Sequence, residues 1–212
     1  KLILSTLLTL FILGCVAVGM VYVQFKSELP DVESLKTVEL QQPMQIYTSD
    51  GKLIGEVGEQ RRVPVKLENI PEKLIQAVLA TEDSRFYEHH GLDPIGIARA
   101  LMVTINKGGT SQGASTITQQ LARNFFLTSE KTFTRKAKEA ILAIEIENAL
   151  NKQEILELYL NKIYLGYRSY GVAAAAKTYF GKELNQLTLS EMAVIAGLPK
   201  APSTMNPLSS PK

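Results

Sequence analysis

The sequence predicts a mainly α-helical domain with a small β element, preceded by one transmembrane helix. Three observations lead to this prediction. Residues 2–25 are almost wholly apolar and carry no charge. Residues 45–48 and 52–57 are strand-like segments on either side of Ser49-Asp50-Gly51, a typical hairpin turn. Beyond residue 70, apolar residues recur mostly at helical spacing, and capping or turn signals separate the segments.

The apolar segment at the start of the chain is long enough to cross a membrane. As a helix it would span about 36 Å, and a hydrocarbon core is about 30 Å thick. Residues 12–15 loosely resemble a lipoprotein cleavage box, but the apolar run continues to Phe25 and favours a membrane span. Lys1 and Lys26 flank the segment, so the positive-inside rule orients it only weakly. We therefore expect residues 1–26 to form a single anchor.

Composition narrows the classes of function. The 212 residues are enough for one domain with a proper core plus appendages. The net charge of +2 is too small to indicate a nucleic-acid partner. Cys15 is the only cysteine, which excludes an internal disulfide framework.

Helix signals recur through the second half of the chain. Pro71 suits a first helical position, and Asn151 and Thr188 each precede a glutamate by three residues, as in a capping box. The predicted helices are 71–82, 93–105, 116–126, 134–150, 152–165 and 188–197. Within the second of them, Ile95, Ile97 and Leu101 could belong to the core or face lipid, and base rates favour the core.

An acidic pair, Glu82-Asp83, ends the first of these helices. A solvated helix end is the ordinary role for such a glutamate. A carboxylate at a helix C-terminus, however, faces the negative end of the helix dipole, and Phe86 and Tyr87 could remove water from it. Such surroundings suit a general acid or base that works near neutral pH. Asp83 could repel its neighbour or bond to the backbone of the turn.

A second carboxylate, Glu139, stands in a basic run. Lys136 and Glu139 are three residues apart and therefore adjacent on a helix. A surface lattice of ion pairs is the ordinary explanation; the alternative is that Arg135 and Lys136 neutralise a pyrophosphate and position Glu139. Residues 113–124, rich in hydrogen-bonding groups, are either a flexible loop with an N-cap or a cradle for sugar hydroxyls and phosphate.

Two further sequence patterns do not indicate a metal site or an acylation site. His89 and His90 have no third ligand at metal spacing, so a role in capping the turn is favoured over zinc binding. Residues 49–52 and 209–212 match Ser-x-x-Lys, but neither sits in the helical context of an acylation site.

In combination, these segments resemble the peptidoglycan glycosyltransferases of family 51, in the form found at the N-terminal half of class A penicillin-binding proteins of the Gram-negative 1a type. The resemblance covers roughly residues 40–208. It is carried, in order, by residues 82–91, 113–121, 135–139, 152–161, 170–181 and 196–199. The family implies a lysozyme-like helical lobe, a smaller lobe near the bilayer, and an active-site cleft between them.

The resemblance also implies an activity: polymerisation of lipid II through β-1,4 bonds, with release of undecaprenyl pyrophosphate. Glu82 matches the catalytic glutamate, the general base for the acceptor 4-hydroxyl. Glu139 matches a second glutamate that stabilises the donor pyrophosphate, directly or through a divalent cation such as Mg²⁺ or Mn²⁺. No tightly bound cofactor and no protein metal site are implied. The substrate-binding positions are Asp83 as support, with Ser115, Gln119, Gln120, Arg123, Lys131, Arg135 and Lys136 at the donor site. Arg123 is lysine in many members, and either cation can neutralise phosphate.

The same resemblance divides the chain and places it in the cell. Residues 1–26 are the expected anchor, 27–44 a juxtamembrane linker, 45–208 the glycosyltransferase domain, and 209–212 the start of a linker to a C-terminal region. The expected location is the bacterial inner membrane, with a cytoplasmic N-terminus and a periplasmic catalytic domain. Expected partners are lipid II, the growing glycan strand, the bilayer and cell-wall synthesis proteins. Moenomycin is the expected inhibitor, and no nucleic acid is expected.

Two alternatives stand beside this hypothesis. One is an enzyme of the lytic transglycosylase or muramidase kind that cleaves the same polymer, because two carboxylates alone would also suit a glycosidase. The other is a membrane scaffold without catalysis. The apolar segment and the cations around Glu139 favour a polyprenyl-pyrophosphate donor, since such a lipid stays in the bilayer and its leaving group is highly charged.

Overall fold

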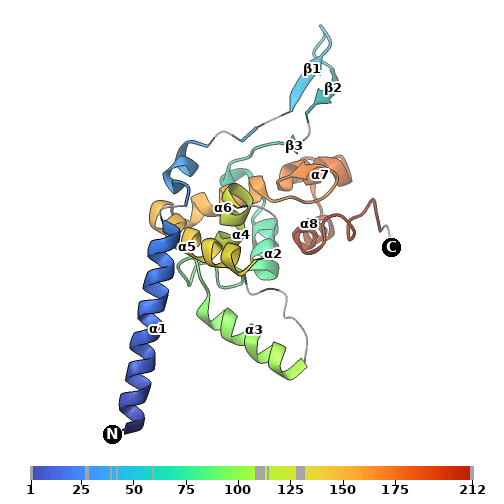
Figure 1. The fold of residues 1–212 in the computed structure, drawn as a ribbon. Coiled ribbons are helices and arrows are strands. Elements are labelled where there is room, and N and C mark those ends of the chain that lie inside the picture. The colour runs from blue at the N-terminus through green and yellow to red at the C-terminus, as the bar shows by residue number, and fades with distance from the viewer. Residues whose placement is uncertain are drawn as a thin grey trace.

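The predicted mainly α-helical class is confirmed by a computed structural model, which describes residues 2–26, 29–38, 40–41, 43–58, 60–107, 113, 115–127 and 132–210. Helix α1 (Leu2–Lys26) extends away from a helical body, and α3 (Pro94–Lys107) lies apart from that body (Figure 1). The body consists of α2 (Glu72–Glu82), α4 (Ile117–Phe126), α5 (Phe133–Ala149), α6 (Lys152–Lys162), α7 (Val172–Phe180) and α8 (Leu189–Gly197). Short 3₁₀ turns occur at Val32–Thr37, Leu67–Asn69, Leu184–Gln186 and Leu198–Lys200.

Helix α1 confirms the predicted helix at the start of the chain. Apolar side chains along it are exposed, among them Leu8, Met20 and Val23. Its last turn meets α5, where the Tyr22 hydroxyl donates a 2.9 Å hydrogen bond to Glu145. The predicted transmembrane role is not shown: none of the helices in the described part of the chain meets the length and apolarity that a membrane crossing requires.

The strands form two small sheets. β1 (Met44–Tyr47) and β2 (Leu53–Val57) pair antiparallel, as predicted, and this hairpin projects from the helical body (Figure 1). Gly51 supplies the positive φ of 81° that the turn between them requires. β3 (Arg61–Arg62) and β4 (Ser169–Tyr170) pair in parallel, which we did not predict. Two-residue strands from distant parts of the chain leave no periodic signal.

The helix boundaries follow local capping chemistry. The side chain of Asn151 accepts a 3.0 Å hydrogen bond from the backbone amide of Glu154. In return, the side chain of Glu154 accepts a 2.8 Å hydrogen bond from the backbone amide of Asn151. Thr188 and Glu191 repeat this arrangement, so both predicted capping boxes are confirmed. α6 ends at Lys162 instead of the predicted residue 165. The chain leaves the helix at Ile163 and turns back, so that the Leu165 amide bonds to the Ser169 carbonyl at 2.9 Å.

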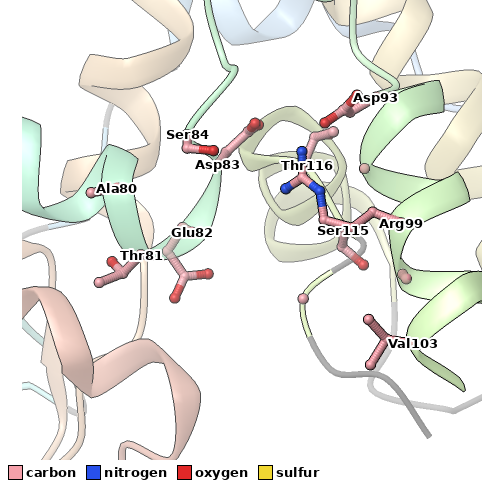
Figure 2. Close-up of a pocket in the computed structure, with 13 residues that line it drawn as sticks. Ala80, Thr81, Glu82, Asp83, Ser84, Asp93, Arg99, Val103, Ser115 and Thr116 are labelled. Carbon is pink, nitrogen blue, oxygen red and sulfur yellow. The ribbon is translucent and has the colours of Figure 1, made fainter. Parts of the chain in front are cut away.

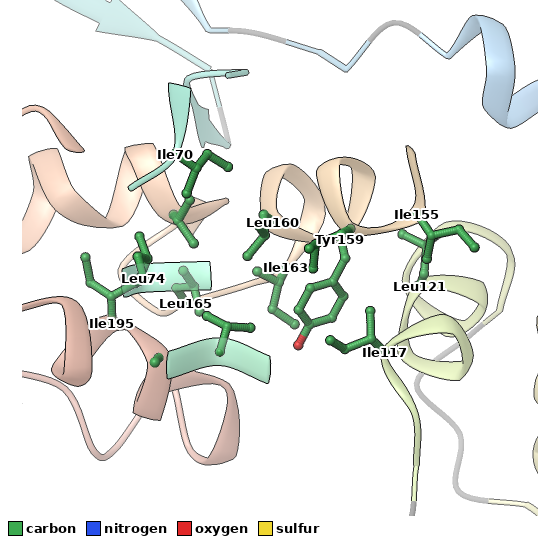
Figure 3. Packing of buried hydrophobic residues seen from close by; sticks show 14 of the residues in the cluster. Ile70, Leu74, Ile117, Leu121, Ile155, Tyr159, Leu160, Ile163, Leu165 and Ile195 are labelled. Carbon is green, nitrogen blue, oxygen red and sulfur yellow. The ribbon is translucent and has the colours of Figure 1, made fainter. Parts of the chain in front are cut away.

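The hydrophobic core lies among α2, α4, α6 and α8 (Figure 3). Leu74, Leu121 and Ile195 bring side chains from α2, α4 and α8 into it. Tyr159 of α6 is completely buried in the same cluster. Its hydroxyl donates a hydrogen bond to the side chain of Gln120.

Helix α3 contradicts the core assignment of its apolar residues. Ile95, Ile97 and Leu101 are 56%, 38% and 58% exposed, and none of the described side chains of α3 is buried. The base rate that favoured the core assumes a helix packed against the body. Because α3 lies apart from the body, its apolar stripe meets no covering layer (Figure 1).

Candidate active site

Glu82 lies at the C-terminal end of α2 and lines two pockets. The α3 pocket, of about 360 Å³, is formed by the end of α2, by α3 and by the start of α4, and includes Asp93, Arg99 and Ser115 (Figure 2). The α8 pocket, of about 550 Å³, includes Gln120, Arg123 and Lys200. Thr81, Glu82, Gly113 and Ser115 line both. One carboxylate therefore belongs to the lining of both pockets.

Two buried polar side chains, bonded one to the other, orient the carboxylate of Glu82. The Gln120 side-chain amide donates a 2.8 Å hydrogen bond to Glu82 Oε2, and the Tyr159 hydroxyl donates to Gln120 Oε1 at 3.3 Å. Burial raises the pKa of Tyr159 well above its usual value, and the negative charge of Glu82 adds to this effect. Tyr159 therefore stays a neutral donor at any working pH.

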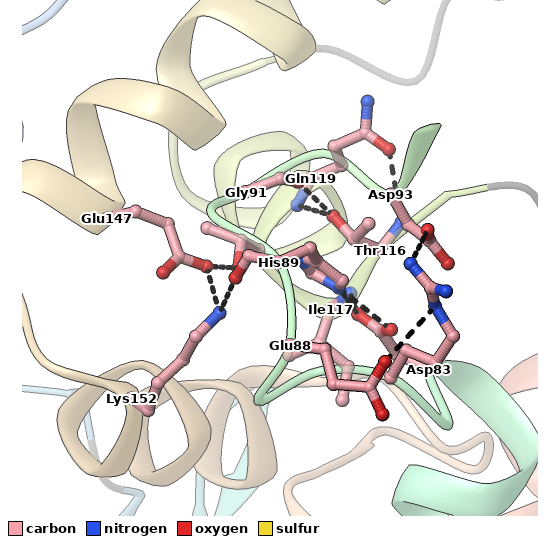
Figure 4. A network of polar contacts seen from close by, with 12 residues as sticks. Asp83, Glu88, His89, Gly91, Asp93, Thr116, Ile117, Gln119, Glu147 and Lys152 are labelled. Carbon is pink, nitrogen blue, oxygen red and sulfur yellow. Dashed lines mark hydrogen bonds and ion pairs between the residues drawn. The ribbon is translucent and has the colours of Figure 1, made fainter. Parts of the chain in front are cut away.

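Asp83 lines the α3 pocket, but its carboxylate bonds to the protein and holds the turn that follows α2. Its carboxylate lies 3.0 Å from His89 Nε2 and accepts a 3.0 Å hydrogen bond from the Ile117 amide at the start of α4 (Figure 4). Both side chains are buried, at 7% exposure for Asp83 and 5% for His89. Protein donors thus occupy the Asp83 carboxylate, the arrangement of a group that supports its neighbour Glu82.

The second predicted carboxylate, Glu139, is buried at 1% exposure between two cations of its own helix. Arg135 Nη1 lies 3.3 Å from one carboxylate oxygen, and Lys136 Nζ lies 2.8 Å from the other. Lys136 also donates a 2.7 Å hydrogen bond to the hydroxyl of Ser115. Burial excludes the surface ion-pair lattice for Glu139, and Lys136 links this helix to a residue that lines both pockets.

Only some of the remaining predicted site residues line one of the two pockets. Arg123 and Gln120 line the α8 pocket. Gln119 does not line either pocket, because its side chain closes a capping box with Thr116 and is buried. Lys131 lies outside the described residues.

Two cations that sequence reasoning missed line the pockets. Arg99 of α3 faces the α3 pocket, and Lys200, just after α8, faces the α8 pocket. Asp93, the acid nearest to Arg99 along the chain, pairs with Arg85 at 2.7 Å instead. A signal for Arg99 existed: it is the only charged residue between Asp93 and Lys107, in a segment that is otherwise mostly apolar.

The described residues contain no group of three or more His, Cys, Asp or Glu side chains arranged to hold an ion. Each oxygen of Glu139 already contacts a cation. Among the described residues, Glu139 Oε1 is buried and accepts no hydrogen bond, so a divalent cation at this position stays a prediction.

Comparison with known proteins gives a consistent picture. Residues 50–212 match the family described as Transglycosylase. The chain is 77% identical over 212 residues to penicillin-binding protein 1A of Haemophilus influenzae. The match covers 100% of this chain and 24% of that protein. It is 64% identical over 199 residues to penicillin-binding protein 1A of Escherichia coli K12, covering 94% of this chain and 23% of that protein. The chain thus spans about a quarter of the length of these curated relatives.

A solved structure gives a further match. It is the 2.6 Å crystal structure of penicillin-binding protein 1A from Haemophilus influenzae, at 54% sequence identity and a TM-score of 0.44. The match covers 82% of this chain and 16% of that one.

Proposed function

The chain belongs to the transglycosylase family, and from this premise we propose that it polymerises lipid II into glycan strands through β-1,4 bonds, with release of undecaprenyl pyrophosphate. Family membership confirms the predicted class of enzyme. One observation carries the substrate and the mechanism: Glu82, oriented by Gln120 at 2.8 Å, lines two pockets that each contain a cation. A polymerase needs two sugar substrates on either side of one base.

Glu82 acts in this proposal as the general base. It removes the proton from the 4-hydroxyl of the acceptor sugar, and the resulting oxygen attacks C1 of the donor sugar. The bond from C1 to the pyrophosphate oxygen breaks, the pyrophosphate leaves with the electron pair, and the configuration at C1 inverts. Among the described residues, Glu82 Oε2 bonds to Gln120 and Oε1 has no protein donor. The second oxygen is therefore available to receive the proton.

The cations around the site support a highly charged leaving group. Arg123 lines the α8 pocket, and Lys136 reaches Ser115 from α5. Glu139 itself would repel a pyrophosphate, so its contribution is to hold the cationic side chains of Arg135 and Lys136 in place. We assign the donor pyrophosphate, and moenomycin as its competitor, to this cationic region.

The proposal includes work at a membrane, because the polyprenyl chain of the donor stays in the bilayer. Exposed apolar side chains on α1 support its role as an anchor, and those on α3 place a second apolar surface beside the α3 pocket. The location proposed is the inner membrane, with the N-terminus cytoplasmic and the catalytic domain periplasmic. Cell-wall synthesis proteins are the proposed protein partners.

The decisive experiment measures glycan formation from purified lipid II by the wild-type chain and by Glu82→Gln. We expect polymer from the wild type, inhibition by moenomycin, and a loss of about 10²- to 10⁴-fold in the variant, the range for a missing general base. Glu88→Gln is the matched control, because Glu88 lies in the same turn with an exposed side chain. Unchanged polymerisation by Glu82→Gln would disprove the mechanism.

The same preparation distinguishes the alternatives. Incubation with purified sacculi should release no soluble fragments. Fragment release without lipid II polymerisation would instead identify a lytic enzyme, and the absence of both activities in the wild type would favour a scaffold.

A further inference from the structure

A partly buried ion pair outside both pockets joins α5 and α6 next to the turn that follows Glu82. Lys152 is the first residue of α6, and its Nζ lies 2.7 Å from Oε1 of Glu147 on α5 (Figure 4). The two side chains are 18% and 5% exposed. Neither residue lines the α3 pocket or the α8 pocket.

The ammonium group of Lys152 also holds the turn itself. It donates a 2.7 Å hydrogen bond to the backbone carbonyl of His89, and it lies 4.3 Å from the centre of the Phe86 ring. His89 and Phe86 are both buried. One cation therefore contacts a carboxylate, a carbonyl and an aromatic face, and the last two belong to the turn after Glu82.

Glu147 connects this cation to α4. The oxygen that accepts from Lys152 also accepts a 2.6 Å hydrogen bond from the hydroxyl of Thr118, which is completely buried in the first turn of α4. The neighbouring Ile117 amide binds Asp83, and Gln120, one turn further, binds Glu82. The turn is therefore linked through Lys152 and Glu147 to α4, and α4 in turn contacts Glu82 and Asp83.

Stability alone does not account for this arrangement. A cation in the first turn of a helix faces the positive end of the helix dipole, which is unfavourable. A largely buried ion pair also loses much of its hydration, and well-packed apolar residues often stabilise a fold equally well. What an apolar pair cannot provide is the hydrogen bond to the His89 carbonyl together with the one to Thr118.

We infer that Lys152 is a positioning residue for the reaction: with Glu147 it fixes the 84–90 turn against the start of α4 and so sets the geometry between Gln120 and Glu82. This inference rests on the proposed function. Substrate binding is left to other groups, since the cations Arg99, Arg123 and Lys200 line the pockets.

The inference predicts a specific kinetic pattern for Lys152→Met, which removes the charge and keeps the length. We expect kcat for lipid II polymerisation to fall by about tenfold to hundredfold, because small displacements of a catalytic group have effects of this size. KM should stay within about twofold of wild type. Lys152→Arg should recover most of kcat, because a guanidinium can donate to both the carboxylate and the carbonyl.

A double variant separates positioning from stability. Lys152→Met leaves Glu147 as a buried, unpaired charge, whereas Lys152→Met with Glu147→Gln removes both charges and should raise Tm again. We expect kcat to stay low in the double variant, because the His89 carbonyl still lacks its donor. Lys182→Met is the matched control: Lys182 pairs with Glu191 at the same 2.7 Å but does not touch the turn. Every variant is assayed at a temperature where circular dichroism shows it folded.

Amide hydrogen exchange of residues 84–90 supplies a readout that does not depend on activity. Exchange should accelerate in Lys152→Met relative to both wild type and Lys182→Met. A kcat within about twofold of wild type, recovery of kcat along with Tm in the double variant, or unchanged exchange would each overturn the inference. A wild-type chain that makes no polymer would overturn the proposed function instead, and the exchange measurement would still decide whether Lys152 holds the turn.

Discussion

The side-chain amide of Gln120 donates a 2.8 Å hydrogen bond to the carboxylate of Glu82, and this contact has only one workable direction. A carboxylate can only accept, so the amide nitrogen faces Glu82 and the amide oxygen faces the Tyr159 hydroxyl at 3.3 Å. The three groups come from α2, α4 and α6. The helical body therefore sets the orientation of a side chain that lines two pockets.

Loss of this amide should lower activity without unfolding the domain. In Gln120→Leu the Glu82 carboxylate loses its donor, and we expect kcat to fall by about tenfold to hundredfold, the equivalent of one hydrogen bond to a charged group. Steady-state polymerisation of lipid II measures the effect. Gln76→Leu, on the exposed face of α2, is the control and should match the wild type. Equal kcat values for the two variants would contradict the orienting role.

Asp83→Asn should destabilise the fold. An asparagine cannot satisfy both the His89 ring and the Ile117 amide as the buried carboxylate does, so we expect a loss of about 1–3 kcal/mol in the free energy of unfolding. Urea denaturation measures this loss. Asp50→Asn, in the exposed hairpin turn, should change it by less than about 0.5 kcal/mol. A raised KM with unchanged stability would show instead that Asp83 contacts substrate.

Arg99→Gln should weaken substrate binding. The guanidinium lines the α3 pocket, and none of the described carboxylates lies within ion-pair distance of it, so we assign it to a negatively charged part of the substrate. We expect KM for lipid II to rise by about tenfold and its dependence on ionic strength to become less steep. Arg61→Gln, remote from both pockets, is the control. If the two variants have the same KM, Arg99 does not bind substrate.

Tyr179 should make stability fall at alkaline pH. Burial, helped by Tyr164 and Tyr167, raises the pKa of Tyr179 from 10.0 to about 12. The unfolded chain therefore loses this proton at a lower pH than the folded chain does. The stabilisation is fully present below pH 10 and is lost as pH rises toward about 12.

The variant Tyr179→Phe tests this relationship. Its free energy of unfolding, from urea denaturation between pH 9 and pH 11.5, should fall less steeply with pH than that of the wild type. The loss of the 2.7 Å hydrogen bond to the Leu165 carbonyl lowers its stability at every pH and does not alter the slope. Tyr87→Phe, with an exposed ring, serves as control. An unchanged slope for Tyr179→Phe would refute the assignment.

Local signals in the sequence predicted local structure. The capping boxes at Asn151 and Thr188 and the hairpin turn at residues 49–51 lie where the residues themselves satisfy nearby backbone groups. The helix α7, between Gly171 and Gly181, was missed because four consecutive alanines have no polar face. The parallel pairing of Arg61 with Ser169 was missed because it depends on the tertiary fold.

The candidate site was predicted in part. Glu82, Glu139 and their basic neighbours came from motifs, and the structure brings Lys136 and Ser115 into contact. The exposed position of α3 and the pocket-facing cations Arg99 and Lys200 depend on how distant segments meet. The pattern of charge and hydrophobicity along one helix does not indicate which distant segments it will contact.

The isolation of α3 makes the two walls of its pocket thermodynamically unequal. The wall that carries Glu82 is packed on the core, whereas none of the described side chains of α3 is buried. Its amide hydrogens should therefore exchange through local opening, at a free energy far below that of global unfolding. A ligand that binds Arg99 must also order this helix, and part of its binding free energy is used for that ordering. The same ligand should slow amide exchange in α3 more than anywhere in α2.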